Sequence, residues 1–273
     1  MRKTLRHSKW APPVGVIGNS RFKRTILMVV LLAIVGLGLA WSATMPIEAP
    51  TVATPGQETV VLLHGLIRSE RAMRKMEREL RGEGYRVINH DYPSTSAPIE
   101  QLTTDVFKAL DPQIKEAKRV HFVTHSLGGI ILRQHLEHHK ISNLGRTVML
   151  APPSQGSEVP DKLGWNAIFR KINGPAGNQL GTGTNSLPLR LGAPAFELGV
   201  IAGDRSINPI LSTLIPGPDD GKVSIARVKP PKLTDFRRVH ATHTFIARNA
   251  TVIAHTKHFL AHGEFENGEV KHD

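Results

Sequence analysis

A serine at the apex of a strand-turn-helix pattern is the residue of this chain best suited to chemistry. Residues 120–129 read VHFVTHSLGG, and the apolar run that follows them is typical of a helix. Such a turn exposes the Ser126 hydroxyl at a sheet edge and frees the Leu127 backbone N–H to bind a developing oxyanion. Gly128 lets the helix approach the strand closely. The pattern predicts a nucleophile at Ser126, with Thr124 replacing the first glycine of the usual G-x-S-x-G motif.

A second oxyanion donor is expected directly after the first apolar strand. Residues 59–63 read TVVLL, and His64, Gly65 and Leu66 follow them. Glycine at position 65 allows the backbone to turn, so that the Leu66 N–H points at a substrate oxygen together with the Leu127 amide. An ordinary strand-ending turn is the alternative. The imidazole of His64 is expected to have a structural role within the loop.

A carboxylate that orients a catalytic base is expected in the loop at residues 218–223, which reads PDDGKV. This loop comes after a late strand and beyond the serine in sequence, where such an acid belongs. Asp220, directly before a glycine, is the preferred residue, and Asp219 and Asp204 are the alternatives. An Asp-Gly pair is also common in plain turns, so the loop has a purely conformational interpretation as well.

The expected general base is His243. It lies between the last predicted strand and the last predicted helix, from where an imidazole can reach the serine. His240 is the alternative; it comes two residues earlier and points to the same side, but it lies within the strand. The predicted order along the chain is therefore Ser126, then Asp220, then His243.

Strands and helices alternate around these residues. Apolar runs predict strands near residues 59–63, 85–89, 119–124, 145–150, 196–202 and 237–241. Periodic segments predict helices over residues 69–81, 99–118 with a break at Asp111-Pro112, 127–139 and 247–262. This alternation indicates an α/β fold, with a mostly parallel sheet and helices on both faces. Residues 153–195 interrupt the rhythm, and we expect them to form a short cap.

The motifs resemble those of bacterial lipases and esterases of the α/β-hydrolase family. Residues 61–66 (VLLHGL) are similar to the oxyanion loop of such lipases. Residues 124–129 (THSLGG) resemble their His-Ser-x-Gly-Gly elbow, in which His125 precedes the serine, and residues 219–223 (DDGKV) resemble their Asp-Gly-x-Val acid loop. The order serine, aspartate, histidine is also that of this family. The resemblance covers roughly residues 57–268 and is poor through 153–195.

The resemblance implies a serine hydrolase that cleaves acyl esters or lipids through an acyl-enzyme intermediate, with neither a metal nor another cofactor. In this mechanism His243 takes the Ser126 proton and returns it to the leaving alcohol, while Asp220 fixes the imidazole. An acyltransferase, an amidase or a thioesterase with the same triad is the alternative among enzymes. A non-catalytic scaffold that binds a lipid or a protein is the alternative outside them.

The N-terminal part of the chain predicts attachment to a membrane. Residues 1–24 carry seven of the twelve net positive charges and no acidic residue, and Ile26–Trp41 is an uncharged run of sixteen apolar or glycine residues. A basic flank before an apolar core is typical of a signal-anchor or an export signal. Sixteen residues span about 24 Å as a helix, against a hydrocarbon layer of roughly 30 Å, so a retained anchor and a cleaved signal both stay open.

Five segments are therefore expected. They are a basic segment over 1–24, a signal-anchor or signal-peptide helix over 25–42, a linker over 43–57, a hydrolase-like domain over 58–268 with its cap-like insertion at 153–195, and a tail over 269–273. The expected location is the bacterial inner membrane, with the catalytic domain facing the periplasm or exterior, or export if the signal is cleaved.

Composition excludes several other classes of protein. Outside residues 1–24 the net charge is small for the length of the chain and aromatic residues are few, which argues against a nucleic-acid partner. The chain has no cysteine, so it has neither a disulfide framework nor a thiolate metal site.

Overall fold

The computed structural model describes residues 57–266. The predicted basic segment (1–24), membrane or signal helix (25–42), nearly all of the linker (43–57) and the tail (269–273) lie outside the described residues. Among residues 57–266, no helix combines the length and the apolar character needed to cross a membrane.

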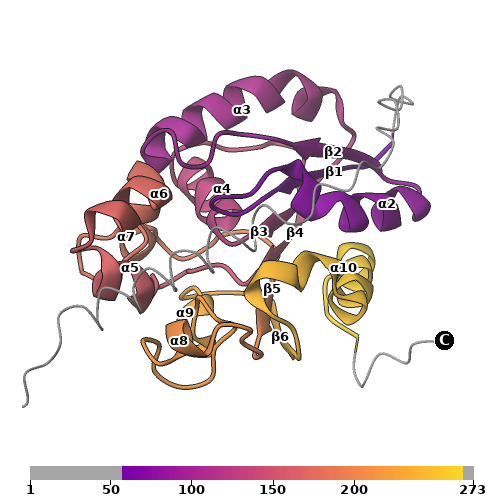
Figure 1. Ribbon diagram of the computed structural model, residues 1–273. Coiled ribbons are helices and arrows are strands. Elements are labelled where there is room, and N and C mark those ends of the chain that lie inside the picture. The colour runs from indigo at the N-terminus through magenta and orange to yellow at the C-terminus, as the bar shows by residue number, and fades with distance from the viewer. Residues whose placement is uncertain (1–56, 267–273) are drawn as a thin grey trace, which may run out of the picture. The chain divides into compact units, whose positions relative to one another are not determined.

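A six-stranded sheet forms the centre of the fold (Figure 1). Its strands are β1 (Thr59–Leu63), β2 (Arg86–His90), β3 (Val120–His125), β4 (Leu144–Leu150), β5 (Leu198–Gly203) and β6 (Asp235–Val239). They are arranged in the order β2-β1-β3-β4-β5-β6, and every neighbouring pair is parallel. Because all strands run in one direction, the loops that follow them gather at one edge of the sheet.

The strand sequences suit a sheet that is covered on both faces. Every residue of β1, β3 and β5 is buried, and strands of this kind are continuous apolar runs rather than alternating ones. Along β1, Val61 and Leu63 belong to one apolar cluster, whereas Val60 and Leu62 belong to another. The sheet therefore has a hydrophobic core on each face, as the sequence predicts.

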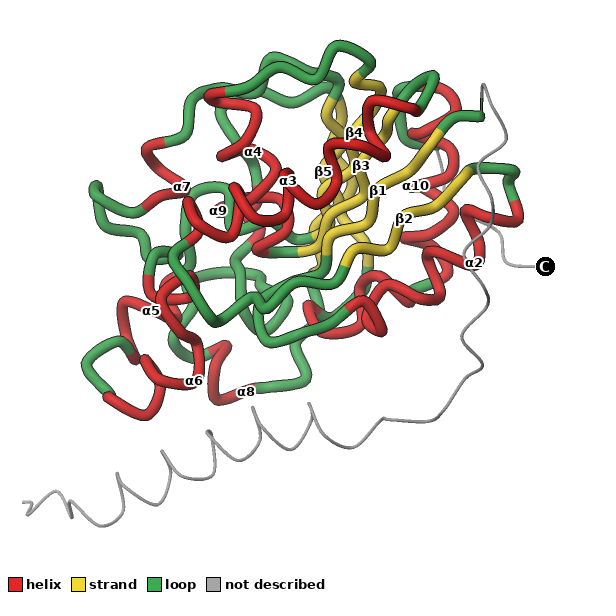
Figure 2. Tube along the Cα trace, turned by 90° about the horizontal axis from the view of Figure 1, so that it is seen from above, coloured by secondary structure: helices red, strands yellow, loops and turns green. Residues whose placement is uncertain are grey.

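Helices cover each of these cores. On one face lie α3 (Ile99–Glu116) and α4 (Leu127–His138), and on the other lie α2 (Arg74–Gly82) and α10 (Ala250–His262). Figure 2 shows the strands between these two pairs of helices. Two 3-10 helices, η1 (Glu70–Met73) and η2 (His243–Arg248), lead into α2 and α10. The alternating pattern in the sequence thus produces an α/β fold with a parallel sheet.

The predicted helix break at Asp111-Pro112 is wrong. α3 runs through Pro112 without interruption, although proline removes a backbone donor and crowds the preceding turn. Leu110 and Ile114, on either side of Pro112, are both buried in the core cluster that α3 shares with α4. Their packing holds the helix together across the proline.

Residues 153–195, predicted as a cap, contain three short helices. They are α5 (Glu158–Leu163), α6 (Ala167–Asn178) and α7 (Leu187–Arg190), and two further short helices that the sequence analysis missed, α8 (Pro209–Ser212) and α9 (Ile225–Val228), follow β5. Side-chain caps explain how a Gly-, Ser- and Asn-rich segment becomes helical, since Asn166 accepts hydrogen bonds from the first amides of α6. In both views α5, α6 and α8 lie on the same side of the molecule (Figures 1 and 2).

Candidate active site

Ser126 forms the turn between β3 and α4. Its backbone has φ 52° and ψ −117°, a conformation that a residue with a side chain adopts only under strain. Two hydrogen bonds hold the turn: Ser126 N–H donates to Leu150 O at 2.9 Å, and Gly129 N–H donates to Ser126 O at 3.0 Å. The strained turn places the hydroxyl at the edge where the parallel strands end, as a nucleophile elbow requires.

Two glycines allow the loops around this turn to touch. A Cβ atom at Gly128 would lie only 2.6 Å from Leu63 O and 2.9 Å from His64 O, and one at Gly65 would lie 3.1 Å from Ser126 Cβ. A side chain at either position would push the start of α4 away from the loop after β1. The absence of a side chain therefore keeps the backbone of residues 64–66 against the serine turn.

The backbone amides of Leu66 and Leu127 belong to these two touching loops. Within residues 57–266 neither amide donates a hydrogen bond, whereas the neighbouring Ile67 N–H donates to Ser94 Oγ at 3.0 Å. Leu127 is the first residue of α4, where amides have no partner in the helix and the helix dipole is positive. Two backbone amides without an acceptor, on the loops that meet at the serine, are donors of the kind that an oxyanion hole uses.

A chain of hydrogen bonds joins Ser126, His243 and Asp220. His243 Nε2 lies 3.0 Å from Ser126 Oγ, and His243 Nδ1 lies 2.7 Å from Asp220 Oδ2. All three side chains are buried. An ionised carboxylate only accepts hydrogen bonds, so the imidazole proton lies on Nδ1 and Nε2 is free to accept the serine proton. The structure thus brings together three residues that are far apart in the sequence.

Backbone contacts fix Asp220 within its loop. Asp220 Oδ1 accepts hydrogen bonds from the amides of Lys222 at 3.0 Å and Val223 at 2.9 Å, which leaves Oδ2 for the imidazole. Gly221 has φ 97°, the left-handed conformation that favours glycine. The His243 N–H also donates to Asp220 O at 2.9 Å, so the acid loop and the histidine loop are joined through the main chain.

The alternative residues Asp219, Asp204 and His240 have other partners. Asp219 accepts hydrogen bonds from Ser212 Oγ and from the backbone of its own loop, at 2.8 Å and 2.6 Å. Asp204 is paired with His240 at 3.0 Å and with Arg238 at 2.6 Å. None of the three alternatives is hydrogen-bonded to the serine or to its imidazole partner.

His64 is buried beneath the loop that it begins. Its Nδ1 lies 2.9 Å from Gly65 O, and its Nε2 lies 3.2 Å from Tyr92 N. The rings of His64 and Tyr92 are stacked, with centroids 4.2 Å apart. Burial lowers the pKa of His64 below its ordinary value. These contacts give the imidazole a structural position, in which it supports the backbone around Leu66.

Two cations that sequence reasoning did not single out also border the site. Arg68 follows the oxyanion loop by two residues, and Lys222 follows Asp220 by two. The Arg68 guanidinium donates to Ile67 O at 3.3 Å and to Thr244 Oγ1 at 3.5 Å. The Lys222 ammonium makes no hydrogen bond or ion pair within the described part of the chain. The available signal was one charged residue two positions after Leu66 and another inside the acid-loop motif at residues 219–223.

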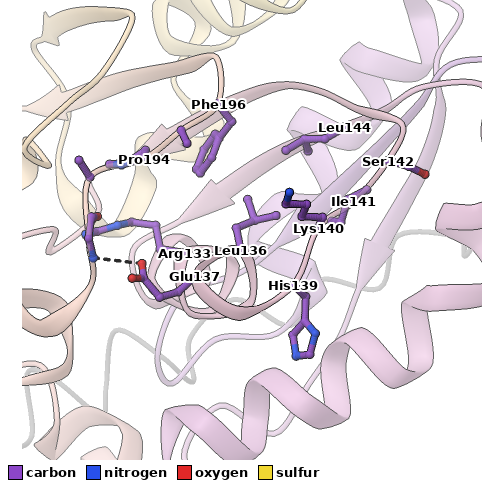
Figure 3. Close-up of a pocket in the computed structure, with 13 residues that line it drawn as sticks. Arg133, Leu136, Glu137, His139, Lys140, Ile141, Ser142, Leu144, Pro194 and Phe196 are labelled. Atoms are coloured by element: carbon purple, nitrogen blue, oxygen red, sulfur yellow. Dashed lines mark hydrogen bonds between the residues drawn. The ribbon is translucent and has the colours of Figure 1, made fainter.

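A separate cavity of about 420 Å³ lies at the other end of α4 (Figure 3). It is lined by residues from the second half of α4, by the loop that leads to β4, and by residues 192–196. At its wall the Gly192 N–H donates to Glu137 Oε2 at 3.0 Å, the dashed line in Figure 3. This cavity contains none of the residues predicted for the catalytic site.

The sequence model of the alpha/beta hydrolase family matches residues 60–260 of this chain. That range contains the serine turn, the acid loop and the histidine described above. No curated protein sequence matches the chain.

Solved structures with a similar fold include enzymes that act on esters. The lipase BlEst2 from Bacillus licheniformis in its mature form gives a TM-score of 0.53 at 21% identity, covering 74% of this chain and 90% of that chain. Its propeptide form gives 0.56 at 20% identity, covering 84% of this chain but only 54% of that chain. A Listeria innocua gene product gives 0.52 at 17% identity, covering 78% and 96%. A thermophilic esterase from Thermogutta terrifontis gives 0.50 at 15% identity, covering 81% and 99%. At these identities the likeness shows a shared fold.

Proposed function

The chain belongs to the alpha/beta hydrolase family, and from this premise we propose that it is a serine hydrolase that cleaves carboxylic esters through an acyl-enzyme intermediate. One observation carries the proposal: the buried hydrogen-bond chain from Ser126 Oγ through His243 to Asp220. An imidazole held in one tautomer by a carboxylate is the device that turns a serine hydroxyl into a nucleophile.

The proposed reaction has two halves, acylation of Ser126 and hydrolysis of the acyl-enzyme, and His243 transfers a proton in each. Ser126 Oγ attacks the ester carbonyl carbon while His243 Nε2 accepts the hydroxyl proton, and the carbonyl oxygen becomes an oxyanion held by the Leu66 and Leu127 amides. Collapse of this intermediate breaks the bond to the alcohol oxygen, which takes the proton from His243. A water molecule then attacks the acyl-enzyme by the same sequence of transfers and releases the acid. Asp220 stabilises the imidazolium in both halves.

Support for an ester as substrate comes from the relatives of the fold. A lipase and an esterase are among the proteins with this architecture. An acyltransferase, an amidase or a thioesterase requires the same triad and differs in what attacks or leaves. Acyl esters, including lipids, are therefore the first substrates to test.

The test is hydrolysis of p-nitrophenyl esters of increasing acyl length, from acetate to palmitate, by the full chain in a non-ionic detergent. We expect turnover by the wild type and a loss of at least about 10³-fold in Ser126→Ala, because the nucleophile acts only as part of the triad. The acyl length with the highest kcat/KM separates an esterase from a lipase. Faster turnover of matched thioesters, amides or added alcohol acceptors than of esters and water would contradict the ester-hydrolase proposal.

We also propose that residues 1–42 direct the chain to the bacterial inner membrane. Support comes from the sequence alone, in which a basic flank precedes an uncharged apolar run. Either a retained anchor or an exported form leaves residues 58–268 facing the periplasm or exterior. Protease digestion of spheroplasts tests this: loss of a C-terminal tag is expected, and full protection contradicts the proposal. The N-terminal residue of the mature protein tells a retained anchor from a cleaved signal.

A further inference from the structure

Two positive charges lie beside the proposed triad without a carboxylate partner. No ion pair of residues 57–266 includes Arg68 or Lys222, although fifteen such pairs occur elsewhere, from His64–Asp91 to Lys257–Glu83. Other arginines and lysines of residues 57–266 also lack an ion pair. Arg68 and Lys222 differ from them in their position, because they lie on or contact the loops that hold Leu66, Asp220 and His243.

Arg68 is held between two loops of the site. Its guanidinium donates to Ile67 O in the loop after β1 and to Thr244 Oγ1, the residue directly after His243. Both hydrogen bonds are long, at 3.3 Å and 3.5 Å, and both acceptors are uncharged. A guanidinium has five N–H donors, so most of them remain free for a ligand.

Lys222 is fixed by its main chain and free at its end. Its N–H donates to Asp220 Oδ1 at 3.0 Å, and its carbonyl accepts from Ser157 Oγ at 2.7 Å. Burial, and then the charge of Arg68, lower the pKa of the Lys222 ammonium to about 8, while Asp220 acts in the opposite direction. Lys222 therefore carries its charge at pH 7, in a place where water solvates it poorly.

Both charges act on one imidazole next to the nucleophile. After burial and the neighbouring His243, Arg68 and Lys222 are the groups that lower the pKa of His125 far below its ordinary value. The His125 ring centroid lies 5.0 Å from that of His243. Thus the facing groups are a neutral imidazole, the triad histidine and the Asp220 carboxylate, whose oxygens already accept three hydrogen bonds. Within residues 57–266 neither cation therefore has a carboxylate at ion-pair distance, although the charge of Asp220 acts on Lys222.

Such an arrangement costs stability unless a ligand completes it. Arg68 and Lys222 are half-buried; removing a charge from water without giving it a partner is unfavourable, and repulsion between two like charges adds to the cost. Guanidinium and ammonium groups bind carboxylates and phosphates through short charge-assisted hydrogen bonds, which are about twice as strong as neutral ones. Unpaired cations beside a nucleophile thus match a substrate that brings its own negative charge.

We propose that Arg68 and Lys222 form an anion-binding subsite, and that the natural ester carries a carboxylate or phosphate close to the bond that is cleaved. The inference rests on the proposed function and names the substrate class of that same site. A carboxylate in the acyl part and a phosphate in the alcohol part offer the same chemistry to the two cations. The test therefore has one arm for each.

Matched esters test the subsite on the full chain in a non-ionic detergent at pH 7. The first pair is mono-p-nitrophenyl adipate and p-nitrophenyl hexanoate, and the second is 1-hexanoylglycerol 3-phosphate and 1-hexanoylglycerol. We expect at least one anionic ester to exceed its neutral partner about 10- to 100-fold in kcat/KM. Lys222→Met and Arg68→Met should each reduce that preference by about tenfold or more, whereas Lys108→Met, on the exposed side of α3, should leave it unchanged. Lys222→Arg, which keeps the positive charge, should keep most of the preference for the anionic ester.

Two results overturn the subsite. One is equal kcat/KM for the anionic and neutral members of both pairs; the other is an equal loss on both members in the Lys222 and Arg68 variants. If no ester is hydrolysed, the proposed function fails, and the subsite is then decided by binding alone. Titration calorimetry of adipate and glycerol 3-phosphate against wild type and Lys222→Met gives that answer: weaker binding by the variant supports the subsite, and equal or absent binding overturns it.

Discussion

Arg133, buried within α4, and Lys222, half-buried in the acid loop, are both cations whose pKa values burial lowers, to about 10 and about 8. The chain surrounds them differently. Arg133 donates to the carbonyl oxygens of Ser154, Leu191 and Gly192, at 3.1 Å, 3.1 Å and 3.2 Å. The Lys222 ammonium donates to no acceptor among residues 57–266. Arg133 is thus held by acceptors of the fold, whereas the Lys222 ammonium has none within the described residues.

The difference separates a cation that stabilises the fold from one available to a ligand. Arg133 joins α4 to the loop after β4 and to the end of the cap, near the cavity at the far end of α4 (Figure 3). Each buried acceptor that it satisfies is worth about 1–3 kcal/mol when the alternative is no partner. Asp220 is likewise fully hydrogen-bonded, since both of its carboxylate oxygens accept from a donor. The Lys222 ammonium differs from both groups, because it has no acceptor among residues 57–266.

The largest effect is expected from a substitution of Asp220, the carboxylate that holds the His243 imidazole. Asp220→Asn should lower kcat for a neutral p-nitrophenyl ester by about 10⁴-fold, because an amide no longer holds His243 in the productive tautomer. Asp219→Asn is the matched control; its carboxylate contacts Ser212 and not the imidazole, so we expect a change of less than about tenfold. Equal losses in the two variants, measured by steady-state kinetics, would move the acid away from Asp220.

Arg133 should contribute to the free energy of unfolding. Arg133→Met removes the donor of three carbonyls, and we expect the free energy of unfolding in denaturant to fall by about 3 kcal/mol. Arg190→Met provides the control, because Arg190 forms an exposed pair with Glu100 and such pairs contribute at most about 1 kcal/mol. A loss at position 133 no larger than that at position 190 would remove the distinction between the two kinds of cation.

Loss of the Lys222 proton should make the preference for an anionic ester depend on pH. The ratio of kcat/KM for the anionic ester to that for its neutral partner reports the charge of the free enzyme. As pH rises through about 8, Lys222 loses its proton, so the ratio should fall several-fold between pH 7 and pH 9.5. Arg68 keeps its charge in that range, and any effect common to the two esters cancels in the ratio. A ratio that stays constant over this interval is incompatible with a role for Lys222.

The smallest expected effect is a gain in stability. Lys222→Met removes a half-buried charge for which burial and repulsion from Arg68 outweigh the attraction of Asp220, and should raise the free energy of unfolding at pH 7 by about 1 kcal/mol, or roughly 2–4 °C in Tm. The gain should shrink as pH rises from about 8, the folded pKa, toward the ordinary value of lysine. In that window the folded lysine is neutral while the unfolded one still binds a proton, so the wild type becomes relatively more stable. Calorimetric melts at pH 7 and pH 10 measure it; a lower Tm of the variant at pH 7 means that the charge is compensated.

The sheet and the positions of the reactive groups could be predicted because they depend on local patterns. Continuous apolar runs mark the buried strands, and parallel strands place their following loops at one edge. That topology alone brings residues 126, 220 and 243 together. The sequence favoured Asp220 but kept Asp219 and Asp204 as alternatives, because the choice depends on which carboxylate faces the imidazole, and only the folded loop shows that contact.

Other features depend on contacts that no local pattern contains. The two cations of the subsite are 154 positions apart; burial lowers the pKa of both, and the charge of Arg68 further lowers that of Lys222. α3 continues through Pro112 because residues on both sides pack into the core. The helices within residues 153–195 depend on single capping side chains such as Asn166, in a segment whose composition favours loops.

The central claim is that Ser126 is a nucleophile activated by His243, and labelling with a fluorophosphonate probe tests it most directly. Such probes form a stable adduct with a serine whose base and oxyanion hole are in place. Peptide mass spectrometry of the labelled full chain should find the adduct on Ser126, with no labelling in Ser126→Ala and much slower labelling in Asp220→Asn. An unlabelled wild type that melts cooperatively, or an adduct on a different residue, would contradict the claim.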